Sequence, residues 1–319
     1  MRKIGILTSG GDTPGMNAAI RAAVKTALHL DMSVYGVLHG YNGLIEGQLI
    51  KLQREDVADI IHKGGTILKT ARSESFKTEE GFEKALSTIK ASGLEGLIVI
   101  GGDGSMRGAR ALSEHKVPTI GLPGTIDNDL SYTDYSIGFY TAVNSVIQEL
   151  YKIMDTMDSL DRIGVVEVMG NKSGCIALYS GLAGASDYII LPEMPFDIDE
   201  ICKGLCAERI KGKTSCVIVV SEASGDCDKI AEYITQKTGF DARGIELGHI
   251  QRGGDPTAFD RILASRMGAH AVKLLSQGIG NRVIGIRNDK IVDYDITEAL
   301  GMQRTFDKEL YDLALMLTE

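Results

Sequence analysis

Residues 123–129, Pro-Gly-Thr-Ile-Asp-Asn-Asp, place two carboxylates and a carboxamide at three consecutive positions. An apolar run at 117–122 precedes them and predicts a buried strand that ends in a turn. Asp127 and Asp129 would face the same side of an extended segment. Two carboxylates at the carboxyl end of a strand could hold a metal ion, accept a proton, or do both. Alternatively, they could cap the next helix or satisfy a turn.

Two glycine-rich segments follow other predicted strands. Residues 8–17, Thr-Ser-Gly-Gly-Asp-Thr-Pro-Gly-Met-Asn, join a predicted strand at 4–8 to a predicted helix at 16–30. Residues 101–105, Gly-Gly-Asp-Gly-Ser, follow a predicted strand at 97–100. Such turns direct backbone N–H groups and a helix N-terminus at an anion. Each could instead be a tight turn without a ligand, and Asp103 could simply cap a helix.

Together, these turns and their carboxylates predict a site for a phosphate compound and Mg²⁺, with Asp103 meeting the metal directly or through water. The first turn is not a Walker loop, because Met16 and Asn17 replace Lys and Ser or Thr. The second lacks the GxGxxG spacing, which argues against a dinucleotide-dependent dehydrogenase.

Several cationic side chains lie among polar or glycine-rich neighbours. Arginine recognises phosphate in a bidentate manner, although a single surface arginine is usually just solvated. Glu222 ends a predicted strand at 217–221, where ligand contacts concentrate in α/β sheets. The cationic candidates are Arg72, Arg162, Arg243, His249 and Arg252.

The composition limits the class of protein. A chain of 319 residues can bury a sizeable core and is expected to form two domains. The net charge of −9 argues against general nucleic-acid binding but not against small anionic substrates. Five cysteines without a CxxC pair argue against zinc or disulfides and favour a reducing, cytoplasmic compartment. No signal peptide or membrane-spanning run of ~20 apolar residues is evident.

Strand-like apolar runs alternate with helical patterns along the chain. This alternation predicts parallel α/β units with helices on both sheet faces and ligands at the carboxyl ends of strands. No Pro/Ser-rich linker separates two halves, so we expect the chain to cross between its domains more than once. Further strands are expected at 34–38, 163–168, 188–191, 217–221 and 283–286, and further helices at 79–92, 142–157, 173–185 and 261–275.

Taken together, these motifs resemble the family of bacterial-type ATP-dependent 6-phosphofructokinases over nearly the whole chain. The matching segments are 6–12, 14–19, 101–105, 123–129, Val-Glu-Val-Met-Gly at 166–170, Leu-Gly-His-Ile-Gln-Arg-Gly-Gly at 247–254 and Asp-Arg-Ile-Leu-Ala-Ser-Arg at 260–266. The resemblance implies an α/β fold of two Rossmann-like three-layer α/β/α domains with mostly parallel sheets. Residues 1–138 plus 252–302 would form the larger ATP- and Mg²⁺-binding domain. Residues 139–251 plus 303–319 would form the smaller fructose 6-phosphate-binding domain.

The resemblance also implies a glycolytic kinase that transfers the γ-phosphate of ATP to the C1 hydroxyl of fructose 6-phosphate, with Mg²⁺ as cofactor. Asp127 would take the hydroxyl proton with Asp129 in support, Arg72 would stabilise the transferring phosphoryl group, and Asp103 would be the metal-linked carboxylate. The nucleotide site would comprise Gly11, Arg72, Ser73, Gly102, Asp103, Gly104 and Ser105. The sugar-phosphate site would comprise Thr125, Ile126, Asp127, Arg162, Met169, Gly170, Asn171, Glu222, Arg243, His249, Ile250, Gln251 and Arg252.

The implied assembly is a homotetramer whose active sites span subunit interfaces, with Arg162 and Arg243 reaching a neighbour's site. ADP, GDP or phosphoenolpyruvate would act as effectors. Their site would comprise Arg21, Lys25, Arg54, Met154, Asp187, Lys211 and Lys213. Lys25 and Met154 stand where the family has Arg, and Thr214 where Lys is usual. Fewer cations weaken phosphate binding, so we expect weakened allosteric control.

Gly104 and Gly124 favour ATP over pyrophosphate, because pyrophosphate-dependent relatives typically carry Asp and Lys at these positions. Asn171 follows Met-Gly where the family usually has Arg, and Ser73 replaces a larger residue, which predicts altered turnover or nucleotide affinity. The alternatives are a pyrophosphate-dependent enzyme and a non-catalytic phospho-ligand sensor on the same fold. The three carboxylates at 103, 127 and 129 argue against the sensor.

Overall fold

A mostly parallel sheet organises the first of two compact units in this computed structural model, which describes residues 1–318. Unit 1 comprises Met1–Ile126, Leu130–Thr141 and Arg252–Arg304. Among the described residues its sheet has seven strands in the order β11-β10-β5-β4-β1-β2-β3, of which β3 and β11 pair antiparallel at the edges. The strands are β1 (Lys3–Ser9), β2 (Ser33–Val37), β3 (Leu49–Leu52), β4 (Gly96–Gly101), β5 (Thr119–Pro123), β10 (Arg282–Arg287) and β11 (Lys290–Asp295).

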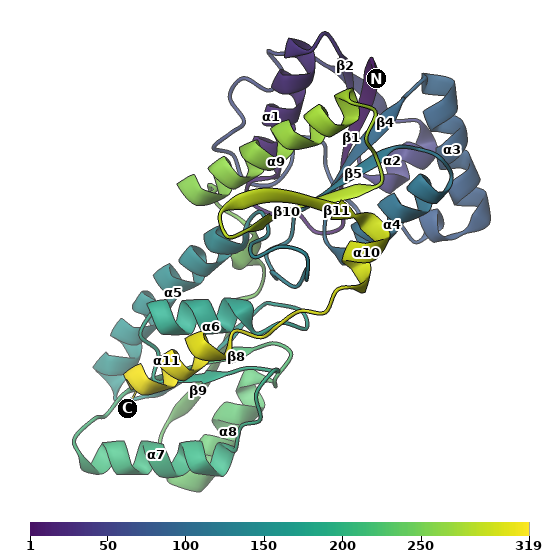
Figure 1. Cartoon of the computed structure of the whole chain (residues 1–319). Helices are drawn as coiled ribbons and strands as arrows, with labels where there is room; N and C mark the ends of the chain where they lie inside the picture. The colour runs from purple at the N-terminus through teal and green to yellow at the C-terminus, as the bar shows by residue number, and fades with distance from the viewer. Residues whose placement is uncertain (319) are drawn as a thin grey trace. The chain divides into compact units, whose positions relative to one another are not determined.

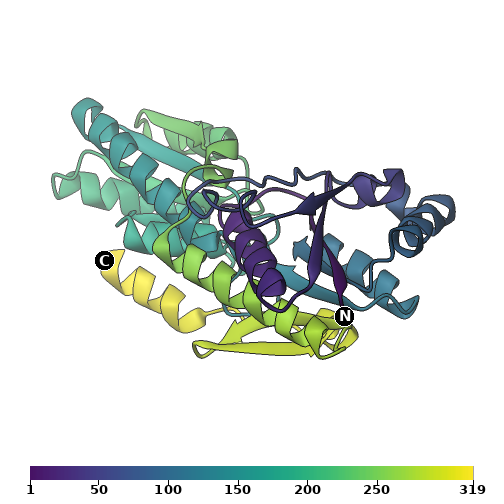
Figure 2. The same ribbon diagram turned by 90° about the horizontal axis from the view of Figure 1, so that it is seen from above.

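Helices cover both faces of this sheet because its central strands are apolar on both sides. In β4, Ile98 and Ile100 join the core beneath α1 and α9, whereas Leu97 and Val99 join the core beneath α3 and α4. Helices α1 and α9 lie side by side (Figures 1 and 2). The helices of unit 1 are α1 (Met16–His29), α2 (Tyr41–Glu46), α3 (Glu79–Ser92), α4 (Asp103–Glu114), α9 (Ala258–Ser276) and α10 (Ile296–Gly301), with a short 3₁₀ turn η1 (Ser75–Lys77).

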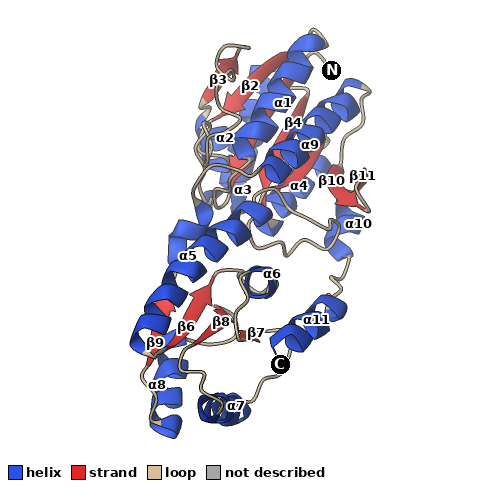
Figure 3. Ribbon diagram, turned by 90° about the vertical axis from the view of Figure 1, so that its left-hand side faces the viewer, coloured by secondary structure: helices blue, strands red, loops and turns tan. Residues whose placement is uncertain are grey.

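Unit 2 comprises Asp127–Asp129, Ala142–Gln251 and the described residues from Thr305 onward. Its described strands form a parallel sheet in the order β7-β8-β6-β9. Helices α7 and α8 pack on one face, and α6 and α11 lie over the other (Figure 3). The elements are β6 (Ile163–Val168), β7 (Tyr188–Ile190), β8 (Cys216–Ser221), β9 (Ala242–Glu246), α6 (Cys175–Ala183), α7 (Ile198–Ile210), α8 (Cys227–Thr238) and α11 (Lys308–Thr318).

Two elements carry the chain from one unit into the other. Helix α5 (Phe139–Leu160) begins in unit 1 and continues in unit 2, and the 3₁₀ turn η2 (Gly248–Arg252) returns the chain to unit 1. The sequence pattern predicted only 142–157 of α5, so it missed the first turn, which lies in unit 1.

The predicted α/β class with mostly parallel sheets is confirmed. The predicted bounds of β6 and α3 match those of the structure. Strands β3, β9 and β11 were not predicted, because their residues are mostly half-exposed or exposed and therefore lack a continuous apolar run.

No helix within residues 1–318 is long and apolar enough to cross a membrane. The five cysteines, all in the described part of the chain, are free thiols. Burial raises the pKa of the Cys227 thiol to about 11 and also raises the pKa of Cys202 and of Cys216. These three thiols therefore stay protonated at neutral pH and pack as small apolar side chains.

Candidate active site

The glycine-rich turn after β1 is fixed by the segment 69–72. The Thr8 hydroxyl donates to the Lys69 carbonyl (2.8 Å), and the Gly10 N–H donates to the Ala71 carbonyl (3.2 Å). Gly10 has a φ of 89°, a left-handed conformation that favours glycine. These contacts hold Ala71 against the turn, and the exposed Arg72 is the next residue in the chain.

A second turn leads from β4 into α4 and lies beside the first. The Ser105 hydroxyl donates to the Ser9 carbonyl (2.9 Å), which joins the first turn of α4 to the end of β1. The Tyr41 hydroxyl donates to the Ser105 carbonyl (2.7 Å), and burial raises the pKa of Tyr41. A Cβ added at Gly104 would meet nothing within 4 Å. Open space at the start of α4 suits an anionic ligand.

Asp103 is the first residue of α4, and its side chain is 47% exposed. Its Oδ2 accepts a hydrogen bond from Arg107 Nε at 2.8 Å. Residues 1–318 contain no group of three or more His, Cys, Asp or Glu side chains that could hold a metal ion. Mg²⁺ commonly binds one or two carboxylates together with water and substrate phosphates. One exposed carboxylate therefore fits Mg²⁺ that arrives with a nucleotide, and it does not fit an ion that the protein alone would hold.

Two residues predicted for different subsites meet in unit 1. A Cβ at Gly11 would lie 2.5 Å from Arg252 Nη1, and the same nitrogen lies 3.4 Å from the Asp12 carbonyl that it donates to. A glycine at 11 therefore makes room for the Arg252 guanidinium. Ser73 has a local role, because its hydroxyl accepts a hydrogen bond from the Phe76 N–H (3.2 Å).

The segment 123–129 begins at the last residue of β5, and Asn128 within it is left-handed, with a φ of 49°. The segment is therefore not extended, and strand alternation does not relate Asp127 to Asp129. Thr125 lies beside Gly102, whose added Cβ would be 3.7 Å from Thr125 Cβ. Ile126 is buried.

Packing alone accounts for glycine at 124. A Cβ there would lie 2.9 Å from Ile100 Cγ2 and 3.2 Å from Met16 Cε. The space that a larger nucleotide needs is thus visible at Gly104 and not at Gly124.

Glu222 and Gln251 of unit 2 hold the turn after β6. Glu222 Oε1 accepts from the N–H groups of Gly170 (2.9 Å) and Asn171 (2.6 Å). Gln251, which is fully buried, accepts from the Met169 N–H through its Oε1 (3.0 Å). Both residues are predicted sugar contacts, which stays a prediction, and in this structure both bind backbone.

The Asn171 side chain contacts one of the two carboxylates of the 123–129 segment. Its Nδ2 donates to Asp129 Oδ2 at 3.4 Å. Asn171 is itself left-handed, with a φ of 56°. The amide thus makes one of the contacts of the Asp129 carboxylate. His249 and Ile250 are exposed in η2.

Arg162 and Arg243 lie at the other end of this sheet. Arg162 Nε binds Asp241 Oδ2 (2.6 Å) and Arg243 Nε binds Asp241 Oδ1 (3.0 Å). The Arg162 hydrogen bond lowers the pKa of Asp241. Arg162 precedes β6, whereas Met169 follows it, so the two are roughly 20 Å apart at ~3.3 Å per residue. The structure does not bring these arginines to the 169–171 turn of their own unit.

A family model described as phosphofructokinase matches residues 3–275. The chain belongs to the phosphofructokinase family. It is 55% identical over 318 residues to a protein of Clostridium tetani, and 53% identical over 319 residues to one of Clostridium botulinum strain Hall, with 100% of each chain covered. Both relatives are named ATP-dependent 6-phosphofructokinase.

Solved structures in the family share the fold. Phosphofructokinase from Saccharomyces cerevisiae is 34% identical with a TM-score of 0.87, covering 99% of this chain and 47% of the yeast chain. A pyrophosphate-dependent phosphofructokinase from Nitrosospira multiformis has a TM-score of 0.87 at 20% identity, covering 100% of this chain and 92% of that chain. At that identity the likeness shows the fold and does not identify the phosphoryl donor.

The residues predicted for effectors divide between the units. Arg21, Lys25 and Arg54 lie in unit 1 and the others in unit 2. Lys213 pairs with Asp187 and also with Glu208 (3.2 Å). Burial alone would lower the pKa of Lys213, but its hydrogen bonds to the two carboxylates and their charges raise it on balance. Sequence reasoning missed Glu208, which has no motif around it.

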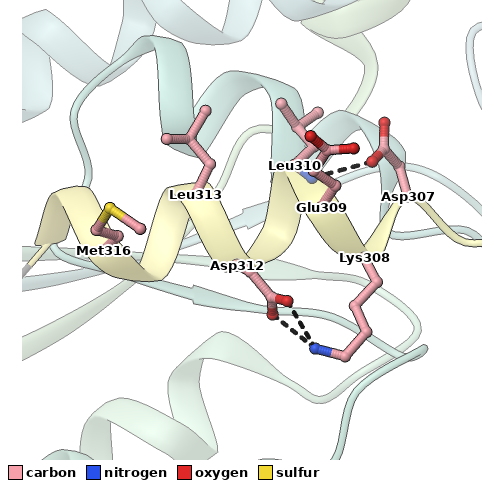
Figure 4. Close-up of a pocket in the computed structure, with 7 residues that line it drawn as sticks. All are labelled: Asp307, Lys308, Glu309, Leu310, Asp312, Leu313 and Met316. Atoms are coloured by element: carbon pink, nitrogen blue, oxygen red, sulfur yellow. Dashed lines mark hydrogen bonds and ion pairs between the residues drawn. The ribbon is translucent and has the colours of Figure 1, made fainter.

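A hollow of about 700 Å³ runs along α11 (Figure 4). Lys308 and Asp312 form an ion pair at 2.7 Å there, and Leu313 and Met316 lie along the same helix. None of the predicted catalytic or ligand residues lines this hollow. Most residues of unit 1 predicted to bind the nucleotide instead follow the carboxyl ends of strands such as β1 and β4, as expected for ligand sites of parallel α/β sheets.

Proposed function

We propose that this protein transfers the γ-phosphate of ATP to the C1 hydroxyl of fructose 6-phosphate, giving fructose 1,6-bisphosphate and ADP. The observation that carries the proposal is the identity of 53–55% over the full chain with proteins named ATP-dependent 6-phosphofructokinase. The carboxylates Asp103, Asp127 and Asp129 support it, because a non-catalytic member of the family would not need all three.

The proposed chemistry assigns one task to each group. Asp127 takes the proton of the attacking hydroxyl, and Asp129, oriented by Asn171, supports it. Arg72 stabilises charge on the transferring phosphoryl group. Asp103 would hold Mg²⁺ that arrives with the nucleotide, and the ion would supply neutralisation of phosphate charge. The open start of α4 at Gly104 supports ATP over pyrophosphate, since nothing there crowds an α-phosphate.

The proposal extends to the domains and the compartment. We infer that residues 1–138 with 252–302 bind ATP and Mg²⁺, and that residues 139–251 with 303–319 bind fructose 6-phosphate. The division of the described chain into two units supports two domains. The cysteine pattern supports a cytoplasmic enzyme.

A coupled assay with either donor tests the proposed reaction. We expect saturable turnover with MgATP and turnover at least tenfold lower with pyrophosphate. We also expect little inhibition by phosphoenolpyruvate at micromolar concentration, because Asp187 and Glu208 already neutralise the Lys213 ammonium. Preference for pyrophosphate would overturn the donor, and steep sigmoidal inhibition would overturn the weakened control.

We further propose a homotetramer in which Arg162 and Arg243 bind the sugar phosphate at a neighbour's site. Their distance from the 169–171 turn of their own unit supports this. Arg162→Ala and Arg243→Ala should each raise the KM for fructose 6-phosphate at least tenfold, since each removes a charge-assisted phosphate contact. Steady-state kinetics measure this, with Lys229→Ala on α8 as the exposed control.

Mixed oligomers separate a shared site from a local one. Chains carrying Asp127→Ser and chains carrying Arg162→Ala are each slow at low fructose 6-phosphate. If one chain supplies the base and its neighbour the arginine, oligomers reassembled from both should regain activity. No gain on mixing, or unchanged KM in both arginine variants, would contradict the shared site.

A further inference from the structure

An arginine forms an ion pair with Asp103, the carboxylate that the proposed function assigns to the metal ion. Arg107 lies one helical turn after Asp103 on α4, and its Nε binds Asp103 Oδ2 at 2.8 Å. The two side chains are 57% and 47% exposed. Sequence reasoning assigned Arg107 no role, although its spacing of four from Asp103 on a helix was readable.

This ion pair is easy to break. A half-exposed pair on a helix contributes less than about fivefold to an equilibrium constant. A guanidinium–phosphate contact contributes more, about tenfold or above. If a metal ion binds Asp103, a new contact between the Arg107 guanidinium and a phosphate would therefore more than replace the lost ion pair.

The position of Arg107 says which anion is near. Side chains on a helix lean toward its N-terminus, so the guanidinium lies over the first turn of α4. That turn contains Gly104, around whose added Cβ there is open space. The glycine-rich turn after β1 is joined to the same place through Ser105 and Ser9. Nucleotide phosphates bound at these turns would lie within reach of the guanidinium.

We propose that Arg107 is a nucleotide-binding residue with two partners. It pairs with Asp103 in the free protein, and it transfers to the nucleotide phosphates when Mg²⁺ engages Asp103. This inference rests on the proposed function, because it takes the nucleotide site to be the one between β1 and α4. The metal ion and Arg107 then compete for the Asp103 carboxylate. Nucleotide binding favours the metal ion there, because the nucleotide phosphates give Arg107 another partner.

Calorimetric titration of the full chain with ADP tests the exchange without turnover. In EDTA, Asp103→Asn should bind ADP about tenfold more tightly than the wild type, because the guanidinium is released and a repelling charge is gone. Adding Arg107→Gln to Asp103→Asn should remove most of that gain and leave only the part that comes from the lost Asp103 charge. In the wild-type background, Arg107→Gln in EDTA should change affinity only about twofold, because the guanidinium is already engaged. With MgCl₂, Arg107→Gln should weaken ADP binding about tenfold.

The helix supplies a matched control. Arg110 pairs with Glu114 at 3.4 Å with the same spacing of four, further from the start of α4. Arg110→Gln should leave ADP affinity unchanged in both backgrounds. A purely additive effect of Arg107→Gln, equal with and without Asp103→Asn, would overturn the inference while leaving the proposed function intact. Failure of the wild type to bind MgADP would overturn both.

Discussion

Replacing Asp127 by Ser is expected to lower kcat by about 10²–10⁴-fold while leaving the affinity for fructose 6-phosphate largely intact. A hydroxyl cannot take the proton that a carboxylate takes, and general-base catalysis of this kind supplies an acceleration of that order. The sugar phosphate would still be held by the arginines and by groups of the 169–171 turn. The loss should therefore fall on kcat and not on KM.

Two controls make this result specific to the base. Asp59→Ser removes an exposed carboxylate of unit 1 outside the predicted sites and should leave kcat unchanged. Asp129→Asn should lower kcat less than Asp127→Ser does, because Asp129 supports the site and is itself oriented by Asn171. A kcat close to the wild type in Asp127→Ser would remove Asp127 from the role of base.

The periodicity of apolar residues predicted the bounds of buried strands and helices most accurately. β6 and α3 follow the expected bounds because their apolar spacing is uninterrupted. The edge strands β3 and β11 were not named, because one side of each strand faces no partner and tolerates polar residues. Helix α5 begins a turn earlier than its pattern suggests, because its first N–H groups are held by a distant carboxylate.

Motifs in the sequence single out candidate site residues, but they do not reveal the contacts that these residues make. Glu222 and Gln251 were singled out as sugar-phosphate contacts, a role that stays a prediction, and in this structure they bind the backbone of the 169–171 turn. No spacing rule reveals such a contact, since the partners are about 50 and 80 residues away in sequence. Asp241, which holds Arg162 and Arg243 together, was missed for the same reason.

Asp260 carries the largest expected effect on stability. It is fully buried at the start of α9, and burial raises its pKa while its hydrogen bonds oppose that shift. Its Oδ1 accepts from the Gly138 N–H and its Oδ2 from the Thr141 N–H, both at 2.8 Å. The carboxylate thus caps the first turn of α5 from another helix. Gly138 follows Ile137, whose carbonyl accepts from the Thr13 hydroxyl in the turn after β1.

Asp260→Asn should therefore lower the free energy of unfolding by about 2 kcal/mol, and Asp260→Ala by about 3–4 kcal/mol. Asparagine has one acceptor oxygen, so its amide N–H₂ must face one of two backbone donors. Alanine leaves both donors without an acceptor.

Urea denaturation measures the losses, with Asp226→Asn as the control. Asp226 caps α8 by the same kind of contact at an exposed position, where asparagine serves equally well. Equal losses in Asp226→Asn and Asp260→Asn would show that burial adds nothing to the cap. A larger loss at Asp260 would show that burial makes this cap contribute more to stability than the exposed cap of α8 does.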